Sequence, residues 1–324
     1  MPIKIDLKDK RILNELDLDA RQPISSIAKK VKLSKQLVGY RIKQLEKKGI
    51  IEGYYAVINI SKLGYLFHRA FFRFQNTSKD KEEEIINYLK SLPDVAWIVT
   101  IDGRWDLAIL TWERNAWEFN NLLEKLLVKY GQYLTDKYIT IVTAIYHFKH
   151  KYLFDKKDLS EALVGGDLED NKLDKIDFEL IKILAVDGRM SLLELSKKLN
   201  ISSKVVVYRM KRLIKKGIID AFRAKINPNL LGYQHYKVFL SLKNIREDTD
   251  SKLLEFFRKH PNIIYSTKAV GEYDIEFELQ AKSNEEFHNI LREVKFNFSD
   301  VIKNYESFLI FYENQINYLP GYID

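Results

Sequence analysis

This chain carries the segment SKQLVGYRIKQLEKKGII at residues 34–51 and repeats it as SSKVVVYRMKRLIKKGII at residues 202–219, an offset of 168 positions. The same offset aligns residues 6–51 with residues 174–219, where 18 of 46 positions are identical. The repeat extends beyond these residues, because Leu63-Gly64-Tyr65 is repeated at the same offset as Leu231-Gly232-Tyr233. Solenoid repeats have periods of about 20–50 residues, so units this long are not a solenoid. The pattern predicts two copies of a two-domain protein in one polypeptide.

The composition is typical of a globular protein with several packed cores. Of 324 residues 46% are hydrophobic, and the aromatic ones include 18 Phe and 19 Tyr. The chain has no cysteine, which excludes disulfides, thiolate metal sites and cysteine nucleophiles. No apolar run approaches the roughly 20 residues of a membrane span, and the N-terminus lacks the apolar core of a signal peptide. We therefore expect a cytoplasmic protein with no membrane partner.

The positive charge is concentrated in the first fifty residues of each copy. Residues 1–52 hold 13 Lys/Arg against 7 Asp/Glu, and residues 174–225 hold 13 against 6. The rest of the chain has 27 against 32, although the whole chain has a net charge of +8. Basic charge confined to one subdomain is typical of a polyanion binder, whereas evenly spread charge would indicate solubility alone.

Three short helices are predicted in each basic segment. In the first copy they are residues 9–17, capped by Asp9, then a helix opened by Pro23, then residues 35–48, capped by Ser34 and ended by Gly49. The second copy has Ser202 and Gly217 at the equivalent positions. Three short helices with a tight turn between the last two form a helix-turn-helix.

The third helix of each copy has an apolar face and an opposite polar face when it is drawn at about 100° per residue. The apolar residues are Val38, Ile42, Leu45 and their counterparts Val206, Met210 and Leu213. A helix of this kind enters the major groove with its N-terminal half against base edges. The predicted DNA-binding residues are Ser34, Lys35, Gln36, Gly39, Tyr40, Arg41, Lys43, Lys47, Ser202, Ser203, Lys204, Val207, Tyr208, Arg209, Lys211 and Lys215.

Two of these residues have an alternative role. Arg41 and Arg209 lie at the boundary between the two faces, about 60° from the centre of the apolar face. Each either pairs with a carboxylate of the first helix or reaches a phosphate, and the residue pattern leaves both roles open.

The remainder of each copy is predicted to be rich in strands. A linking strand is expected at residues 53–59 and again at 221–227, followed by the order strand, helix, strand, strand, helix, strand. The expected elements are residues 68–75, 80–91, 95–101, 106–112, 116–129 and 138–148, and then 236–243, 249–259, 263–269, 273–280, 284–295 and 302–312. That order is the split βαβ, ferredoxin-like pattern.

The two subdomains together resemble the leucine-responsive/AsnC (feast/famine) family of transcription regulators. The resemblance rests on residues 28–34, on Tyr40-Arg41-Ile42, on residues 45–51, on Leu63-Gly64-Tyr65 and on the loop Gly103-Arg104-Trp105-Asp106, which returns as Gly271-Glu272-Tyr273-Asp274. It implies an α+β fold: a tandem duplication of a winged-type helix-turn-helix and a ferredoxin-like βαββαβ sensor domain. Family members are usually single modules, so the tandem is a departure from the pattern.

The resemblance also implies dimerisation through the sensor domain and a small effector, commonly an amino acid, near the Gly-x-x-Asp loop. The residues expected to bind an effector are Thr100, Asp102, Gly103, Arg104, Asp106, Lys268, Gly271, Glu272 and Asp274. The alternative is that Asp102-Gly103 is only a hairpin turn, closed by the Asp106 side chain. Because Arg104 and Glu272 differ in charge, the two loops are not expected to bind alike.

The competing functional hypothesis is an enzyme. Siroheme decarboxylases look similar in architecture, exist as paired or fused modules, and act on a porphyrin with His and Arg side chains. The six histidines are His68, His147, His150, His235, His260 and His288. A third hypothesis is a protein that coats DNA without sequence preference, which a specificity ratio would separate from a regulator.

These observations predict a sequence-specific DNA-binding regulator that is not an enzyme and has no cofactor and no metal site. Its partners would be double-stranded DNA and a small effector, possibly an amino acid. The expected domains are residues 1–52 and 174–220 as helix-turn-helix domains, 53–150 and 221–324 as linking strand and sensor domains, and 151–173 as a linker. We expect the two copies to pair within one chain, as an internal pseudo-dimer, and then to assemble further.

Overall fold

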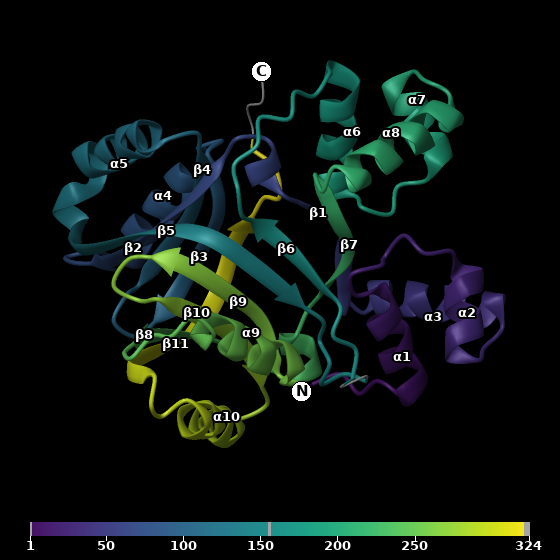
Figure 1. Cartoon of the computed structure of the whole chain (residues 1–324). Coiled ribbons are helices and arrows are strands. Elements are labelled where there is room, and N and C mark those ends of the chain that lie inside the picture. Colours follow the sequence, from purple (N-terminus) through teal and green to yellow (C-terminus); the bar gives the residue numbers. More distant parts are fainter. Residues whose placement is uncertain (1, 155–156, 321–324) are drawn as a thin grey trace.

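The computed structural model describes residues 2–154 and 157–320. It contains two helix-turn-helix domains on one side of a larger body of strands and helices (Figure 1). The first domain comprises α1 (Leu7–Leu16), α2 (Ile24–Val31) and α3 (Lys35–Lys47). The second comprises α6 (Lys175–Val186), α7 (Leu192–Leu199) and α8 (Ser203–Lys215). Both predicted helix-turn-helix domains are therefore confirmed.

The helix boundaries follow from capping side chains. Ser34 and Ser202 accept hydrogen bonds from the main-chain N–H groups three residues on, as predicted. The predicted cap Asp9 is wrong, because Asp6 caps α1 by accepting a hydrogen bond from the Asp9 N–H. The helix therefore begins one turn earlier, and Asp9 lies in its first turn, where a carboxylate stabilises the positive end of the helix dipole.

The linking strands form a two-stranded antiparallel ribbon between the DNA-binding domains and the body (Figure 1). These strands are β1 (Ile51–Ile58) and β7 (Ile219–Ile226). Tyr55 lies directly opposite Arg223, which is its counterpart in the other copy. A residue that faces its own counterpart marks a two-fold axis, so the pseudo-dyad of the molecule passes through the centre of this ribbon.

Each sensor domain has the predicted βαββαβ order. In the first copy the elements are β2 (Leu66–Phe74), α4 (Lys79–Lys90), β3 (Val95–Asp102), β4 (Leu107–Glu113), α5 (Ala116–Tyr130) and β5 (Leu134–Phe148). In the second they are β8 (Gln234–Leu242), α9 (Thr249–Lys259), β9 (Ile263–Val270), β10 (Ile275–Ala281), α10 (Asn284–Asn297) and β11 (Ile302–Ile316). Short 3-10 turns lie at η1 (Ile60–Lys62), η2 (Gly131–Tyr133) and η3 (Asn229–Leu231).

The two sensor sheets join at both edges to form a closed ring of eight strands. Strand β3 pairs with β11 and β5 pairs with β9, both antiparallel, while β2–β4–β3 and β2–β5 complete the first half. Aromatic side chains from both copies pack across this junction, for example Phe71 against Phe239 with ring centroids 5.5 Å apart. The expected pairing of the two copies within one chain is therefore confirmed.

The segment predicted as a linker, residues 151–173, contains a strand that the prediction missed. This strand, β6 (Glu161–Gly165), pairs with the outer side of β5. Its end is held by Asn59, whose side-chain amide donates to the Gly165 carbonyl at 3.1 Å and whose amide oxygen accepts from the Gly165 N–H at 3.0 Å. The connection between the copies is thus partly built into the body.

The DNA-binding domains are fixed to each other and to the opposite copy's strand. The Arg21 guanidinium of the first domain donates to the Gly188 and Met190 carbonyls of the second at 2.8 and 2.9 Å. The Gly188 N–H donates to the Tyr54 carbonyl at 2.8 Å, and a Cβ at Gly188 would lie 2.7 Å from the Tyr55 backbone. Close approach of the loop between α6 and α7 to β1 therefore requires glycine at position 188.

Candidate DNA interface and ligand sites

The third helix of each DNA-binding domain has a buried face and an exposed face, as predicted. Val38, Ile42 and Leu45 are 0%, 4% and 2% exposed. Tyr40 and its counterpart Tyr208 are 60% and 64% exposed, and each lies at the centre of the exposed face of its helix. The exposed residues around them are Ser34, Lys35, Gln36, Lys43, Lys47, Lys48, Ser202, Lys204, Lys211, Lys215 and Lys216. Gly39, Ser203 and Val207 are partly exposed at the edges of the same faces.

Arg41 and Arg209 pair with carboxylates of the first helix in each domain. The Arg41 guanidinium lies 2.8 Å from both Asp6 and Asp9, and that of Arg209 lies 2.6 Å from Asp174 and 2.9 Å from Asp177. The hydrogen bonds that Arg41 donates to Asp9 and Asp6 raise its pKa. The sequence left two roles open for these arginines. The geometry favours pairing with a carboxylate of the first helix over contact with a phosphate, because each arginine holds the third helix against the first.

The Gly-x-x-Asp loops use their aspartates to hold the end of a neighbouring strand. The Asp106 carboxylate accepts a hydrogen bond from the Phe74 N–H at 2.8 Å, and Asp274 accepts one from the Leu242 N–H at 2.7 Å. In both copies the carboxylate therefore has a structural role, but it satisfies a backbone donor of β2 or β8 instead of closing its own turn. Asp102 and Gly103 are exposed at the tip of the first loop.

The two loops face each other across the pseudo-dyad. The Arg104 guanidinium lies 3.4 Å from the Glu272 carboxylate, 3.2 Å from the Tyr273 hydroxyl and 3.0 Å from Glu306. The oppositely charged residues Arg104 and Glu272 therefore form an ion pair between the two copies. Identical residues at these positions would place like charges together, so the duplication allowed a complementary pair to arise.

A pocket of about 340 Å³ lies beside the first loop. Of the expected effector residues, Thr100 and Asp106 line it, together with Phe74, Gln75, Asn76, Thr77, Glu82 and Ile101. Lys268, the counterpart of Thr100, instead pairs with Asp250 at 2.5 Å. At Gly271 a Cβ would lie 2.4 Å from the Tyr138 hydroxyl, so that loop is packed tightly against β5. The two loops thus differ in their surroundings, as their sequences predicted.

A larger cavity of about 480 Å³ lies between the ribbon and the sensor sheets. Both copies line it, and its walls include Tyr55, Phe67, Arg69, Trp97, Leu110, Trp112, His147, His150, Arg223, Lys225, His235, Lys237, Tyr265, Glu278, Gln280, Glu313 and Tyr318. The sequence analysis missed this cavity, because its walls come from all eleven described strands, which are scattered through both copies. The one signal available was the set of histidines at the ends of strands.

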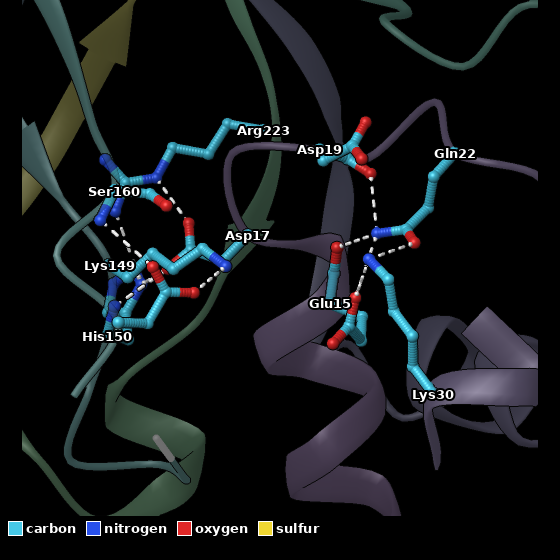
Figure 2. A network of polar contacts seen from close by, with 10 residues as sticks. Glu15, Asp17, Asp19, Gln22, Lys30, Lys149, His150, Ser160 and Arg223 are labelled. Carbon is cyan, nitrogen blue, oxygen red and sulfur yellow. Dashed lines mark hydrogen bonds and ion pairs between the residues drawn. The ribbon is translucent and has the colours of Figure 1, made fainter. Parts of the chain in front are cut away.

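The cavity borders a buried polar cluster (Figure 2). Asp17 accepts from the Arg223 Nε–H at 2.7 Å, and its other oxygen lies 2.8 Å from both the His150 main-chain N and the His150 Nδ1. Asp17 and Arg223 are each 1% exposed. A second group in the same view, Lys30 with Glu15 at 2.7 Å and Gln22 at 3.1 Å, ties α1 to α2.

The histidines are held in structural pairs or kept neutral. His68 Nδ1 lies 2.8 Å from Glu113, and His235 Nε2 lies 2.9 Å from Glu278. Burial, and then the charge of Arg223, lower the pKa of His147 to about 3. The offset of 168 aligns His235 with Phe67 and not with His68, so the two histidines are not at equivalent positions of the two copies.

The fold and its two exposed basic helices define a helix-turn-helix DNA-binding protein. A family model described as winged helix-turn-helix DNA-binding matches residues 5–52 and again residues 173–220. The chain is 34% identical to HTH-type transcriptional regulator FL11 of Pyrococcus furiosus over 119 residues, which are 37% of this chain and 78% of that protein. It is 35% identical to HTH-type transcriptional regulator LrpA of Pyrococcus horikoshii over 125 residues, 39% of this chain and 87% of that protein. The chain therefore belongs to the Lrp/AsnC family of transcription regulators.

The whole tandem is also similar in structure to the siroheme decarboxylase NirDL. The TM-score is 0.64, with 96% of this chain and 93% of that chain covered, at 14% sequence identity. At this identity the likeness concerns the fold alone. Among the described residues no helix is long and apolar enough to cross a membrane.

Proposed function

We propose that this protein is a sequence-specific transcription regulator in which one chain supplies both DNA-reading helices of an operator complex. The observation that supports it best is the pair of exposed faces on α3 and α8, with Tyr40 and Tyr208 at their centres, held by one ribbon. Selection of bound duplexes from a random pool, followed by comparison with non-specific DNA, tests it. Equal affinity for every sequence would instead support a DNA-coating protein. As a DNA-binding regulator related to archaeal and bacterial ones, the protein is proposed to act in the cytoplasm.

A single chain is expected to occupy one full operator. The ribbon pairing and the closed strand ring lie within one chain, so no second chain is needed to assemble the two reading helices. Sedimentation of a labelled operator with increasing protein should give one chain per operator, or a dimer of chains carrying two operators. Binding that appears only when chains dimerise would contradict the proposal.

The selected operator is expected to be imperfectly two-fold. Gln36 and Lys204 occupy equivalent exposed positions, as do Gly39 and Val207. Glutamine suits adenine, whereas lysine suits the O6 and N7 atoms of guanine. The half-sites should share a core, differ at one or two positions, and be about one helical turn apart or a multiple of it. A perfectly palindromic site would indicate that these residues do not touch bases.

The pocket beside the first loop is proposed as the site of a small effector such as an amino acid. Thr100 and the Asp106 and Glu82 carboxylates offer a hydroxyl and negative charge to an ammonium group. A Thr100→Lys variant, which introduces the residue of the second copy, should weaken binding about tenfold or more in calorimetric titrations with a panel of amino acids. Thr135→Lys, on an exposed position of β5, is the matched control. Equal binding by both variants would remove the pocket from consideration.

Further assembly of chains is part of the proposal. Trp117 and Val128 on α5 and Phe296 on α10 are 72%, 89% and 84% exposed. Large exposed apolar side chains of this kind support an interface between copies of the chain. Light scattering over a range of protein concentrations measures the assembly.

The second candidate is an enzyme that acts on a tetrapyrrole. It is favoured by the similarity of fold over nearly the whole chain and by the histidines and arginines at the central cavity. Absorbance titration with an iron porphyrin distinguishes the two functions. A regulator is expected to give no saturable spectral shift, while a shift at one equivalent per chain would favour the enzyme.

A further inference from the structure

The two copies contribute opposite chemistry to the central cavity. At seven of the twelve equivalent pairs that line it, the first copy has an apolar or aromatic side chain and the second has a polar or charged one. The pairs are Tyr55 and Arg223, Val57 and Lys225, Phe67 and His235, Trp97 and Tyr265, Leu110 and Glu278, Trp112 and Gln280, and Ile145 and Glu313. Two copies with identical lining residues would make a symmetric cavity. The cavity of this protein instead has an apolar end and a polar end.

The apolar end is formed by large side chains whose polar atoms are already satisfied. Phe67 and Trp112 pack with ring centroids 6.4 Å apart. The Trp112 Nε1–H donates to the Pro93 carbonyl at 3.2 Å, so its ring presents only carbon atoms for further contact. With Leu110 they form a surface suited to a flat aromatic or branched hydrocarbon body.

The polar end contains a balanced set of charges, one unsatisfied donor on Arg69 and, behind it, one unsatisfied acceptor on Glu276, which does not line the cavity. Lys237 lies 2.6 Å from Glu278 and 3.0 Å from Glu276, and the Arg69 Nη1 lies 2.5 Å from Glu276. The Arg69 Nε–H, however, has no hydrogen-bond partner among the described residues, although Arg69 is 3% exposed. A buried donor without an acceptor is unfavourable, so an acceptor group on a ligand would be stabilised there.

We propose that the central cavity binds an amphipathic organic acid. Its apolar body would lie against Phe67, Leu110 and Trp112, and its acidic head would accept a hydrogen bond from Arg69. A volume of about 480 Å³ is in the range of small-molecule sites. This site is separate from the pocket beside the first loop. Because Tyr55 and Arg223 of the ribbon line the same cavity, the bound acid contacts the element that carries both DNA-binding domains.

The test uses the full-length protein and the fluorescent aromatic acid 1-anilinonaphthalene-8-sulfonate. We expect saturable binding of one molecule per chain, with energy transfer from Trp97 and Trp112, which line the cavity. Decanoate should displace the probe, whereas decanol, which lacks the acidic head, should displace it much less well. Several weak sites without energy transfer, or equal displacement by the acid and the alcohol, would overturn the proposal.

Variants built from the second copy's own residues sharpen the test. Leu110→Glu and Arg69→Lys each introduce the counterpart residue and should weaken probe binding about tenfold or more. Ile245→Glu, at an exposed position in the loop after β8, makes the same kind of change outside the cavity and should leave binding unchanged. If Leu110→Glu does not fold, Ala96→Ile narrows the apolar end instead, because Ala96 lines the cavity and its counterpart is Ile264. Full binding by Arg69→Lys and Ala96→Ile would contradict the assigned position of the ligand.

Discussion

A Gln36→Ala/Tyr40→Ala variant is expected to bind the selected operator with an affinity lower by roughly 1–3 kcal/mol for each base contact removed. This is about 5- to 150-fold for one contact and more for two. The reason is that both side chains project from the N-terminal half of α3, the part of such a helix that reaches base edges. Competition titrations against duplexes altered at single positions should show relaxed specificity in one half-site only, because α8 is unchanged.

The control for this result is a lysine on the same helix. Lys47 is exposed near the C-terminal end of α3, where phosphates are expected. Lys47→Ala should weaken binding to all sequences similarly and lower the slope of log affinity against log salt by about one. If neither variant changes affinity or specificity, α3 is not the reading helix. Ile245→Ala, at an exposed position in the loop after β8, should have no effect on either quantity.

Most of the fold could be predicted from the sequence because its signals are local and occur twice. Serine caps at positions 34 and 202 and glycines at 49 and 217 mark the third helices, and these positions have the expected geometry. The strands and helices of the sensor domains lie within a few residues of their predicted bounds. The error at α1 arose because Asp6 and Asp9 are both capable caps, and the choice depends on which one meets a free N–H.

The features that could not be predicted depend on contacts between distant segments. Strand β6 exists because β5 offers a free edge and Asn59 holds Gly165, and neither is visible in residues 151–173 alone. The internal roles of Arg41 and Arg209 depend on the spacing of two helices. The central cavity was missed because its apolar and polar ends are separated by 168 positions, although the sequence already contained each pair.

The second large effect is expected at the buried cluster of Asp17, Arg223 and His150. Asp17→Ala leaves the Arg223 guanidinium buried without its carboxylate, and breaking a buried ion pair in this way costs about 3–5 kcal/mol. The free energy of unfolding, measured by urea denaturation at pH 7, should fall by this amount. The matched control is Asp19→Ala, which removes a nearby carboxylate that is exposed and lies outside the cluster.

The second copy supplies the compensating variant. The counterparts of Asp17, His150 and Arg223 are Ala185, Tyr318 and Tyr55, respectively, and Tyr55 and Tyr318 stack with ring centroids 3.8 Å apart. The triple variant Asp17→Ala/His150→Tyr/Arg223→Tyr should therefore recover most of the loss, since replacing a whole buried ion cluster by packed side chains is often neutral. If the triple variant is as unstable as Asp17→Ala alone, the polar cluster stabilises the fold more than packed aromatic side chains do in its place.

The pH dependence of unfolding separates the ion cluster from its aromatic replacement. Burial alone would raise the Asp17 pKa, but the charge of Arg223 and the hydrogen bonds from His150 hold it well below its usual range. A carboxyl pKa lowered on folding stabilises the protein above the unfolded pKa of about 3.9, and that stabilisation is lost as the pH falls further. Burial also lowers the His150 pKa, so protonation in the unfolded state removes stability below about pH 6.5. The triple variant lacks both groups. Between pH 7 and pH 4 its free energy of unfolding should therefore fall less than that of the unmodified protein. His147, which lies beside Arg223, Glu278 and Asp17 and whose pKa is lowered by burial, remains in the variant and keeps part of this pH dependence.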